Sequence, residues 1–195
     1  MNKSLIIAIF CFLFLCCRGE SGNFKIYYQK ANEKLNQYYI DGLSTHLDTA
    51  LYYANQLNAS SQYKVRGVNL KLTLYMLSKK YEAGYEYVDS LLERDFNRSY
   101  QKNQYKKTFK ALLFEKQNNI SSRDSCYKEI VVEIEKFINE NPLDKNAITD
   151  LFYVKLKFED KDKVINEITL MQSQKSNNND FLETLKETIN SMGKK

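Results

Sequence analysis

The chain has 195 residues and a formal net charge of +5, with 43% hydrophobic and 27% charged residues, proportions typical of a folded domain. One Pro and six Gly are few helix breakers for this length, which favours long helices over a many-turned β architecture. Basic residues are interspersed with acidic ones, without the concentrated stripe typical of nucleic-acid binders, so we expect no nucleic-acid partner.

The first 16 residues have the composition of an export leader. Lys3 gives a short positive start, and residues 5–15 form an uninterrupted apolar run. A membrane-spanning helix needs roughly 20 such residues, whereas the apolar core of a secretory leader needs about 7–15. We therefore predict a signal peptide at residues 1–16 rather than a membrane span.

The apolar run stops at Cys16-Cys17 and is followed by a polar stretch that contains Gly and Ser. This junction resembles the signal of bacterial lipoproteins, in which a Leu-x-x-Cys box is cut before a cysteine that receives diacylglycerol. A cut before Cys17 places the small Cys16 just ahead of the cut, but Phe14 where Leu is usual. A cut before Cys16 places Leu13 at the usual position, but the bulky Leu15 just ahead of the cut.

We prefer Cys17 as the lipidated residue, with a linker at residues 17–23. Lipid chains at this position, palmitate among them, would hold the protein on a membrane through their buried methylenes. The resemblance thus implies a location in the bacterial cell envelope, either facing the periplasm or at the outer membrane. Plain secretion, with a leader that happens to end in cysteines, is the alternative.

From residue 24 onward, apolar residues recur at steps of three and four, as they do on one face of an α-helix. Residues 81–94 and 127–138 show this pattern clearly. The alternation typical of a half-buried strand is not sustained anywhere for more than a few residues. The sequence therefore predicts an all-α domain over residues 24–195.

The apolar pattern also recurs at a spacing of 34 residues in two places. In the first place, Ala50, Ala54 and Leu57 align with Gly84, Val88 and Leu91. In the second place, Ile130, Ile134 and Phe137 align with Val164, Ile168 and Met171. This recurrence resembles the tetratricopeptide repeat, a helix–turn–helix unit whose second helix carries such residues at these offsets. Tyr75 and Pro142 fall where that family has its first-helix Tyr and its closing Pro. The resemblance covers about residues 24–174.

The chain departs from this family by lacking Trp and by a longer spacing between its second and third units. Gly84 and Ile130 are 46 residues apart, twelve more than 34, and we expect the additional residues to lengthen a helix over 98–117 and a polar loop over 118–125. The resemblance implies antiparallel helical hairpins stacked as a short solenoid, because one amphipathic hairpin cannot cover its own apolar face. A C-terminal capping helix is expected at residues 180–191.

Residues that could carry catalysis are few. His46 is the only histidine, and we expect it to have a structural role near the start of a helix. There is no CxxC pair, HExxH motif or glycine-rich phosphate loop, and the acidic run at 159–163 lacks the spacing of a calcium loop. Cys126 is expected to be a small buried residue. We therefore predict no catalytic residue, no metal, no cofactor and no enzymatic activity.

Eleven of the 15 tyrosines lie in the N-terminal half of the chain. Tyrosine offers a large contact area with a hydroxyl and few rotors, which suits binding surfaces. One hypothesis is therefore a groove for a peptide or protein partner, lined by Tyr28, Tyr38, Tyr39, Lys64, Asn69 and Tyr75. The sequence is equally compatible with tyrosines that simply fill the core.

Repeat arrays function mainly by recognition, so the expected function is that of a membrane-anchored envelope scaffold that binds another protein through its helical surface. The alternative is an immunity-type lipoprotein that neutralises a toxin in the cell envelope. An envelope enzyme or a glycan-binding accessory protein is a third possibility, which a buried polar cleft would favour.

Overall fold

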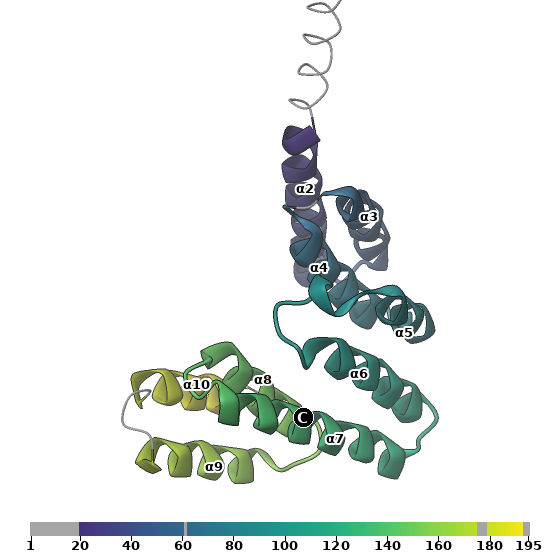
Figure 1. The fold of residues 1–195 in the computed structure, drawn as a ribbon. Helices are drawn as coiled ribbons and strands as arrows, with labels where there is room; N and C mark the ends of the chain where they lie inside the picture. Colours follow the sequence, from purple (N-terminus) through teal and green to yellow (C-terminus); the bar gives the residue numbers. More distant parts are fainter. Residues whose placement is uncertain (1–19, 61, 175–178, 193–195) are drawn as a thin grey trace, which may run out of the picture. The chain divides into compact units, whose positions relative to one another are not determined.

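The computed structural model describes residues 20–60, 62–174 and 179–192, and this part of the chain consists of helices and turns without a strand (Figure 1). The predicted all-α class is confirmed. The elements are α2 (Glu20–Asp41), α3 (Ser44–Asn55), the 3₁₀ helix η1 (Gln56–Ala59), α4 (Lys64–Leu77), α5 (Tyr81–Ser90), the 3₁₀ helix η2 (Glu93–Asp95), α6 (Gln101–Lys116), α7 (Ile120–Glu140), α8 (Lys145–Lys155), α9 (Lys161–Gln174) and α10 (Asn179–Ser191).

The chain divides into two compact units. Unit 1 comprises the residues up to Gly84 together with Leu92–Asn97, and unit 2 comprises Tyr85–Leu91 together with Arg98–Lys195. Helix α5 begins in unit 1 and ends in unit 2.

The core of unit 1 lies between α2, α3, η1 and α4. Helices α2 and α3 pack along each other, and Ala31, Ala50 and Ala54 are completely buried. Because alanine ends at Cβ, these three positions let neighbouring helices approach closely. Larger side chains fill the remaining core, among them Leu35, Leu47, Leu57, Tyr63, Leu70 and Leu74.

Helix α4 comes unusually close to η1 at Gly67. A Cβ atom at this position would lie 2.8 Å from the Cβ of Leu57, which is closer than real Cβ contacts. Leu57 itself is completely buried. The absence of a side chain at Gly67 therefore allows the contact between α4 and η1.

Unit 2 is built from helices that pack on their neighbours in the chain, α6 on α7, α7 on α8 and α9 on α10. Its core residues include Phe152 of α8, Ile134 of α7, Ile168 of α9 and Leu182 of α10, each at most 1% exposed. The face of α10 opposite this core is polar, with Glu183, Thr184, Glu187, Thr188 and Asn190 exposed.

Most of the residues that match at the 34-residue spacing have buried side chains. Buried positions are Ala50, Ala54, Leu57, Gly84, Val88, Leu91, Ile130, Ile134, Val164 and Ile168, whereas Phe137 and Met171 are half-buried. Their predicted orientation toward the protein interior is confirmed.

Two predicted boundaries around α6 and α7 need correction. The expected polar loop at 118–125 is wrong for most of its length, because α7 already begins at Ile120. Asn118 has a φ of 57° and turns the chain, and the side chain of Asn119 then accepts a hydrogen bond from the backbone N–H of Ser122. This cap satisfies a free donor in the first turn of α7, so the polar residues start a helix. The helix expected at 98–117 is shorter and spans Gln101–Lys116.

Other boundaries also differ. The helix expected at 81–94 ends at Ser90, and η2 follows because the Asp95 carboxylate accepts the backbone N–H of Leu92 at 3.1 Å. Helix α2 begins at Glu20, so residues 20–23, expected to belong to a linker, are helical. The predicted leader and Cys17 lie outside the described residues. Pro142 lies in the turn between α7 and α8, as predicted.

Candidate functional site

The six residues predicted to line a binding groove all lie on α2 or α4 of unit 1. On α2, Tyr28 and Tyr38 are half-buried against the core, whereas Tyr39 is 63% exposed. The ring centroids of Tyr38 and Tyr39 are 5.9 Å apart. The Tyr28 ring instead contacts Tyr63, at 5.8 Å. Part of the tyrosine area on α2 is therefore used to pack the fold.

The three predicted residues on α4 differ in their surroundings. The ammonium of Lys64 lies 2.6 Å from the buried carboxylate of Asp95. The Oδ1 atom of Asn69 is buried and has no hydrogen-bond partner within the described ranges. Tyr75 is half-buried, and burial raises the pKa of its hydroxyl while nearby Lys80 opposes this shift.

The ion pair of Lys64 with Asp95 holds η2 against the start of α4. Burial alone would raise the pKa of Asp95, but hydrogen bonds from Lys64 and from the backbone of Leu92 outweigh burial and hold that pKa below its usual range. The pairing gives Lys64 a structural role in addition to the binding role predicted for it.

The turn between α2 and α3 exposes a group of apolar side chains that sequence reasoning largely missed. Ile40 is 85% exposed, Tyr39 63% and Leu43 56%. We call these three residues the apolar tip. They surround Gly42, whose φ of 73° is readily adopted only by a residue without a side chain. The turn signal at Gly42 could have identified them, because apolar residues on either side of a helix–helix turn cannot reach the interior of the hairpin.

Asp41 fixes the backbone of this turn. Its Oδ1 accepts the N–H of Leu43 at 2.9 Å, and its Oδ2 lies 2.9 Å from Nε2 of His46. The hydrogen bond from the Leu43 backbone is the main cause of a lowered pKa of Asp41, and His46 lowers that pKa further. His46 therefore has the structural role predicted for it, near the start of α3.

The opposite end of unit 1 carries a cluster of five tyrosines, which we call the aromatic end: Tyr27, Tyr28, Tyr52, Tyr53 and Tyr63. Tyr53 stacks on Tyr27 with centroids 6.3 Å apart and contacts Tyr52 edge-on at 5.4 Å. Lys30 lies over the ring of Tyr53 at 5.4 Å, and Arg66 lies over that of Tyr63 at 6.0 Å. Both cations are exposed. This end therefore combines aromatic rings with positive charge.

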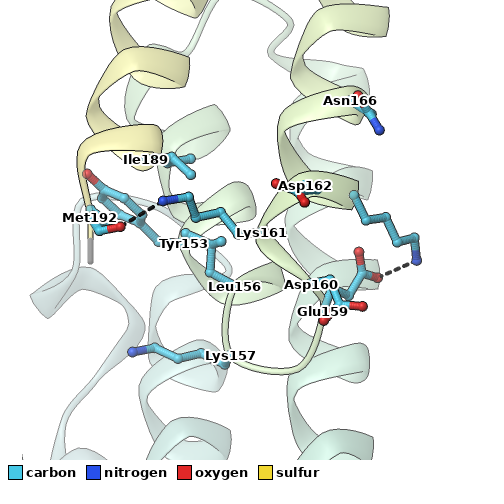
Figure 2. A pocket seen from close by; sticks show the side chains of 11 residues that line it. Tyr153, Leu156, Lys157, Glu159, Asp160, Lys161, Asp162, Asn166, Ile189 and Met192 are labelled. Carbon is cyan, nitrogen blue, oxygen red and sulfur yellow. Dashed lines mark hydrogen bonds and ion pairs between the residues drawn. The ribbon is translucent and has the colours of Figure 1, made fainter. Parts of the chain in front are cut away.

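Unit 2 contains an open cavity of about 1000 Å³ beside the α8–α9 turn and the end of α10 (Figure 2). Lys161 points across it and donates hydrogen bonds to the carbonyl oxygens of Asn190 and Met192, both at 2.7 Å. Glu159 pairs with Lys163 at 3.1 Å. These charges stabilise the end of α10 and the start of α9, where a cation and a carboxylate are favoured respectively. The lining includes neither histidine nor cysteine.

A partly buried polar network links the segment just before α6 to the start of α8. Arg98 donates two hydrogen bonds to Asp144, at 2.8 and 2.9 Å, and the Tyr100 hydroxyl donates to Asp150 at 2.8 Å. Burial raises the pKa of Tyr100, of Asp150 and of Tyr105, the last to about 12. Structural networks and active sites both produce such shifts. Here each pair ties the segment before α6 to α8 or its cap, which is the geometry of a structural network.

Across the described residues, no group of three or more His, Cys, Asp or Glu side chains is arranged to hold a metal ion. Cys126 is buried and free, as predicted, and burial raises the pKa of its thiol. Within the same ranges, none of the helices combines the length and the apolar character that crossing a bilayer requires.

Comparison with known proteins does not extend this description. No family model, no curated protein and no solved structure matches the chain.

Proposed function

We propose that the protein is a lipid-anchored, protein-binding module of a bacterial envelope and that the apolar tip is its principal contact with the partner. The observation that carries this proposal is the exposure of Ile40, Tyr39 and Leu43 on one short turn. Single exposed apolar residues are common on protein surfaces, but adjacent ones on a fixed turn are typical of interaction sites.

The energetics of the apolar tip suit binding. Burying one Ile or Leu side chain contributes about 1.5–3 kcal/mol, and a tyrosine adds contact area with a hydroxyl that can pair at the rim. Because Asp41 already fixes the turn through Leu43 and His46, little conformational entropy is lost when a partner orders it. Two or three anchors of this kind commonly dominate an interface.

The sequence supports the remaining parts of the proposal. The 34-residue recurrence, together with the burial of the matched positions, agrees with tetratricopeptide-like hairpins, and the polar outer face of α10 agrees with a capping role. The apolar leader that ends in Cys16-Cys17 supports lipidation at Cys17.

Site-specific photo-crosslinking tests the binding surface. A photoreactive amino acid at Ile40 should give a discrete crosslinked product in the producing cell, whereas the same residue at Val132 of α7, which is 66% exposed, should not. Leu43→Asp should weaken the crosslink at position 40 at least about tenfold, the equivalent of ~1.4 kcal/mol, without loss of helicity. Equal crosslinking at both positions would contradict the proposal.

Metabolic labelling with a palmitate analogue tests the anchor. We expect label in the wild-type chain, in Cys16→Ser and in the control Cys126→Ser, and no label in Cys17→Ser. Absence of label from the wild-type chain would remove the lipid anchor from the proposal and leave the binding surface to be judged by crosslinking.

A further inference from the structure

The aromatic end has a composition suited to one particular surface. Its rings come from α2, α3 and the segment before α4. Tyr52 is 62% exposed and gives this end its exposed ring, whereas Tyr63 belongs to the core and the other three are half-buried against it. Exposed cations surround them, with Lys30 and Arg66 over two of the rings and Lys25 exposed on α2. Tyrosine is enriched at the boundary between lipid and water, and lysine and arginine are attracted to anionic headgroups.

The position of this end in the chain is as informative as its composition. Helix α2 begins at Glu20, three residues after Cys17. Three residues span at most about 10 Å even when extended. Tyr27 lies seven residues into the helix, about 10 Å of helical rise from Glu20. These two lengths add to about 20 Å. A lipid on Cys17 would therefore keep the aromatic end within roughly 20 Å of the bilayer surface.

We propose that the aromatic end docks on the headgroup region of an anionic bilayer, an inference that rests on the lipid anchor of the proposed function. A single acyl chain gives only marginal membrane binding, and stable attachment uses a second contact such as basic residues. Lys25, Lys30 and Arg66 supply that contact, and the exposed ring of Tyr52 lies among the headgroups. The apolar tip, at the other end of α2, faces away from the lipid.

Depth-dependent fluorescence quenching tests this orientation in the complete lipidated protein. The protein is reconstituted into vesicles that contain an anionic lipid and a headgroup-attached nitroxide quencher. A fluorophore is placed at Asn55→Cys, at the aromatic end, or at the matched position Thr45→Cys near the start of the same helix. Both positions are exposed, and both variants also carry Cys126→Ser, which removes the buried free thiol. The protein with Cys126→Ser alone is the control for background labelling. We expect quenching several-fold stronger at position 55 than at 45.

Charge variants provide the second measurement. Lys25→Glu should reduce the quenching at position 55, whereas Lys79→Glu, the same charge change at the opposite end of unit 1, should leave it unchanged. Quenching that is unaffected by Lys25→Glu would overturn the electrostatic part of the contact.

The outcomes separate this inference from the proposed function. Protein that fails to float with the vesicles would remove the anchor and the docking together. Protein that floats but is quenched equally at positions 45 and 55 would overturn the docking and leave the anchor intact. Shielding of position 55 from a water-soluble quencher, without quenching from lipid, would identify a protein occupant and overturn the bilayer as the docking surface.

Discussion

Two carboxylates of α8 and its cap, six positions apart, experience opposite environments. Asp144 accepts both hydrogen bonds from Arg98 and also the backbone N–H of Ala147 at 3.0 Å, so it caps α8. The hydrogen bond from Arg98 is the main cause of its lowered pKa. Asp150 is more deeply buried, and burial raises its pKa although the Tyr100 hydroxyl donates to it.

These environments predict opposite effects of the same substitution. Asp144→Asn should destabilise unit 2 by about 1.5–3 kcal/mol, because Arg98 loses its charged acceptor while the cap to Ala147 survives. Asp150→Asn should stabilise it at pH 7, because the amide oxygen can still accept from Tyr100 without burying a charge. Urea denaturation at pH 7 measures both. A loss of stability in Asp150→Asn would show that its negative charge is needed beside Arg98.

The pH dependence follows from the signs of these shifts. The contribution of Asp144 is fully present above its unfolded pKa, about 3.9, and is lost as the pH falls through its lower folded pKa. For Asp150 the folded pKa is the higher one, so its ionisation penalty is complete above the folded pKa and disappears below about 3.9. The stability gained in Asp150→Asn should therefore shrink as the pH is lowered from 7 to about 4. A gain that stays constant over this range would contradict the raised pKa.

Lys71 of α4 is the buried lysine of unit 1, with 4% of its surface exposed. Burial lowers its pKa to about 8, against an unfolded value near 10.4. Because the unfolded chain then holds the proton more tightly, stability should rise between pH 8 and about 10.4. We expect Lys71→Met to stabilise the protein at pH 7 by on the order of 1–3 kcal/mol, and the difference should narrow above pH 8. Denaturant titrations at pH 7 and 10 measure the free energy of unfolding of both proteins, with the exposed Lys79→Met as control. A stability difference between Lys71→Met and the wild type that is the same at both pH values would contradict the lowered pKa of Lys71.

At the scale of elements, the close approach of α4 to η1 depends on Gly67. Alanine in place of a helical glycine normally stabilises a helix by about 1 kcal/mol. Here its Cβ would meet the Cβ of buried Leu57 at 2.8 Å, and overpacking of this kind costs about 1–3 kcal/mol. Gly67→Ala should therefore lower the stability of unit 1, whereas Gln29→Ala, at an exposed position of α2 in the same unit, should change it by less than about 0.5 kcal/mol. The measurement is the melting temperature of the wild type and of the two alanine variants. A higher melting temperature for Gly67→Ala than for the wild type would refute the steric argument.

The elements show which features could be predicted from sequence. Helical class and the burial of residues such as Ala50 and Ile134 follow from local periodicity, which the sequence displays directly. The start of α7 was missed because a run of polar residues resembles a loop unless the capping role of Asn119 is recognised. The pairing of Lys64 with Asp95 joins residues 31 positions apart and depends on how η2 folds back, which periodicity does not describe. The exposure of Ile40 depends on the end of α2 at Asp41, a boundary fixed by the turn at Gly42.

At the scale of the whole molecule, the chain forms two compact units, each with its own buried core. Proteins open in cooperative units of this kind. We expect Gly67→Ala to accelerate amide hydrogen exchange in α2, α3 and α4 while leaving exchange in α7 and α8 unchanged. Mass spectrometry of peptides from both units provides the measurement. Equal acceleration in α7 would show that the two units unfold as one.

The length of α2 has a consequence for where a partner can be met. Tyr28 of the aromatic end and Tyr39 of the apolar tip are 11 residues apart on this helix, a rise of about 17 Å, which is still more than the thickness of a headgroup layer. If one end rests on lipid, the other is held at a constant height above it by a rigid rod rather than by a flexible tether. Membrane-bound partners would then be selected by how far their binding surfaces project from the bilayer, and proteins that lie flat against the headgroups would pass beneath the contact without engaging it.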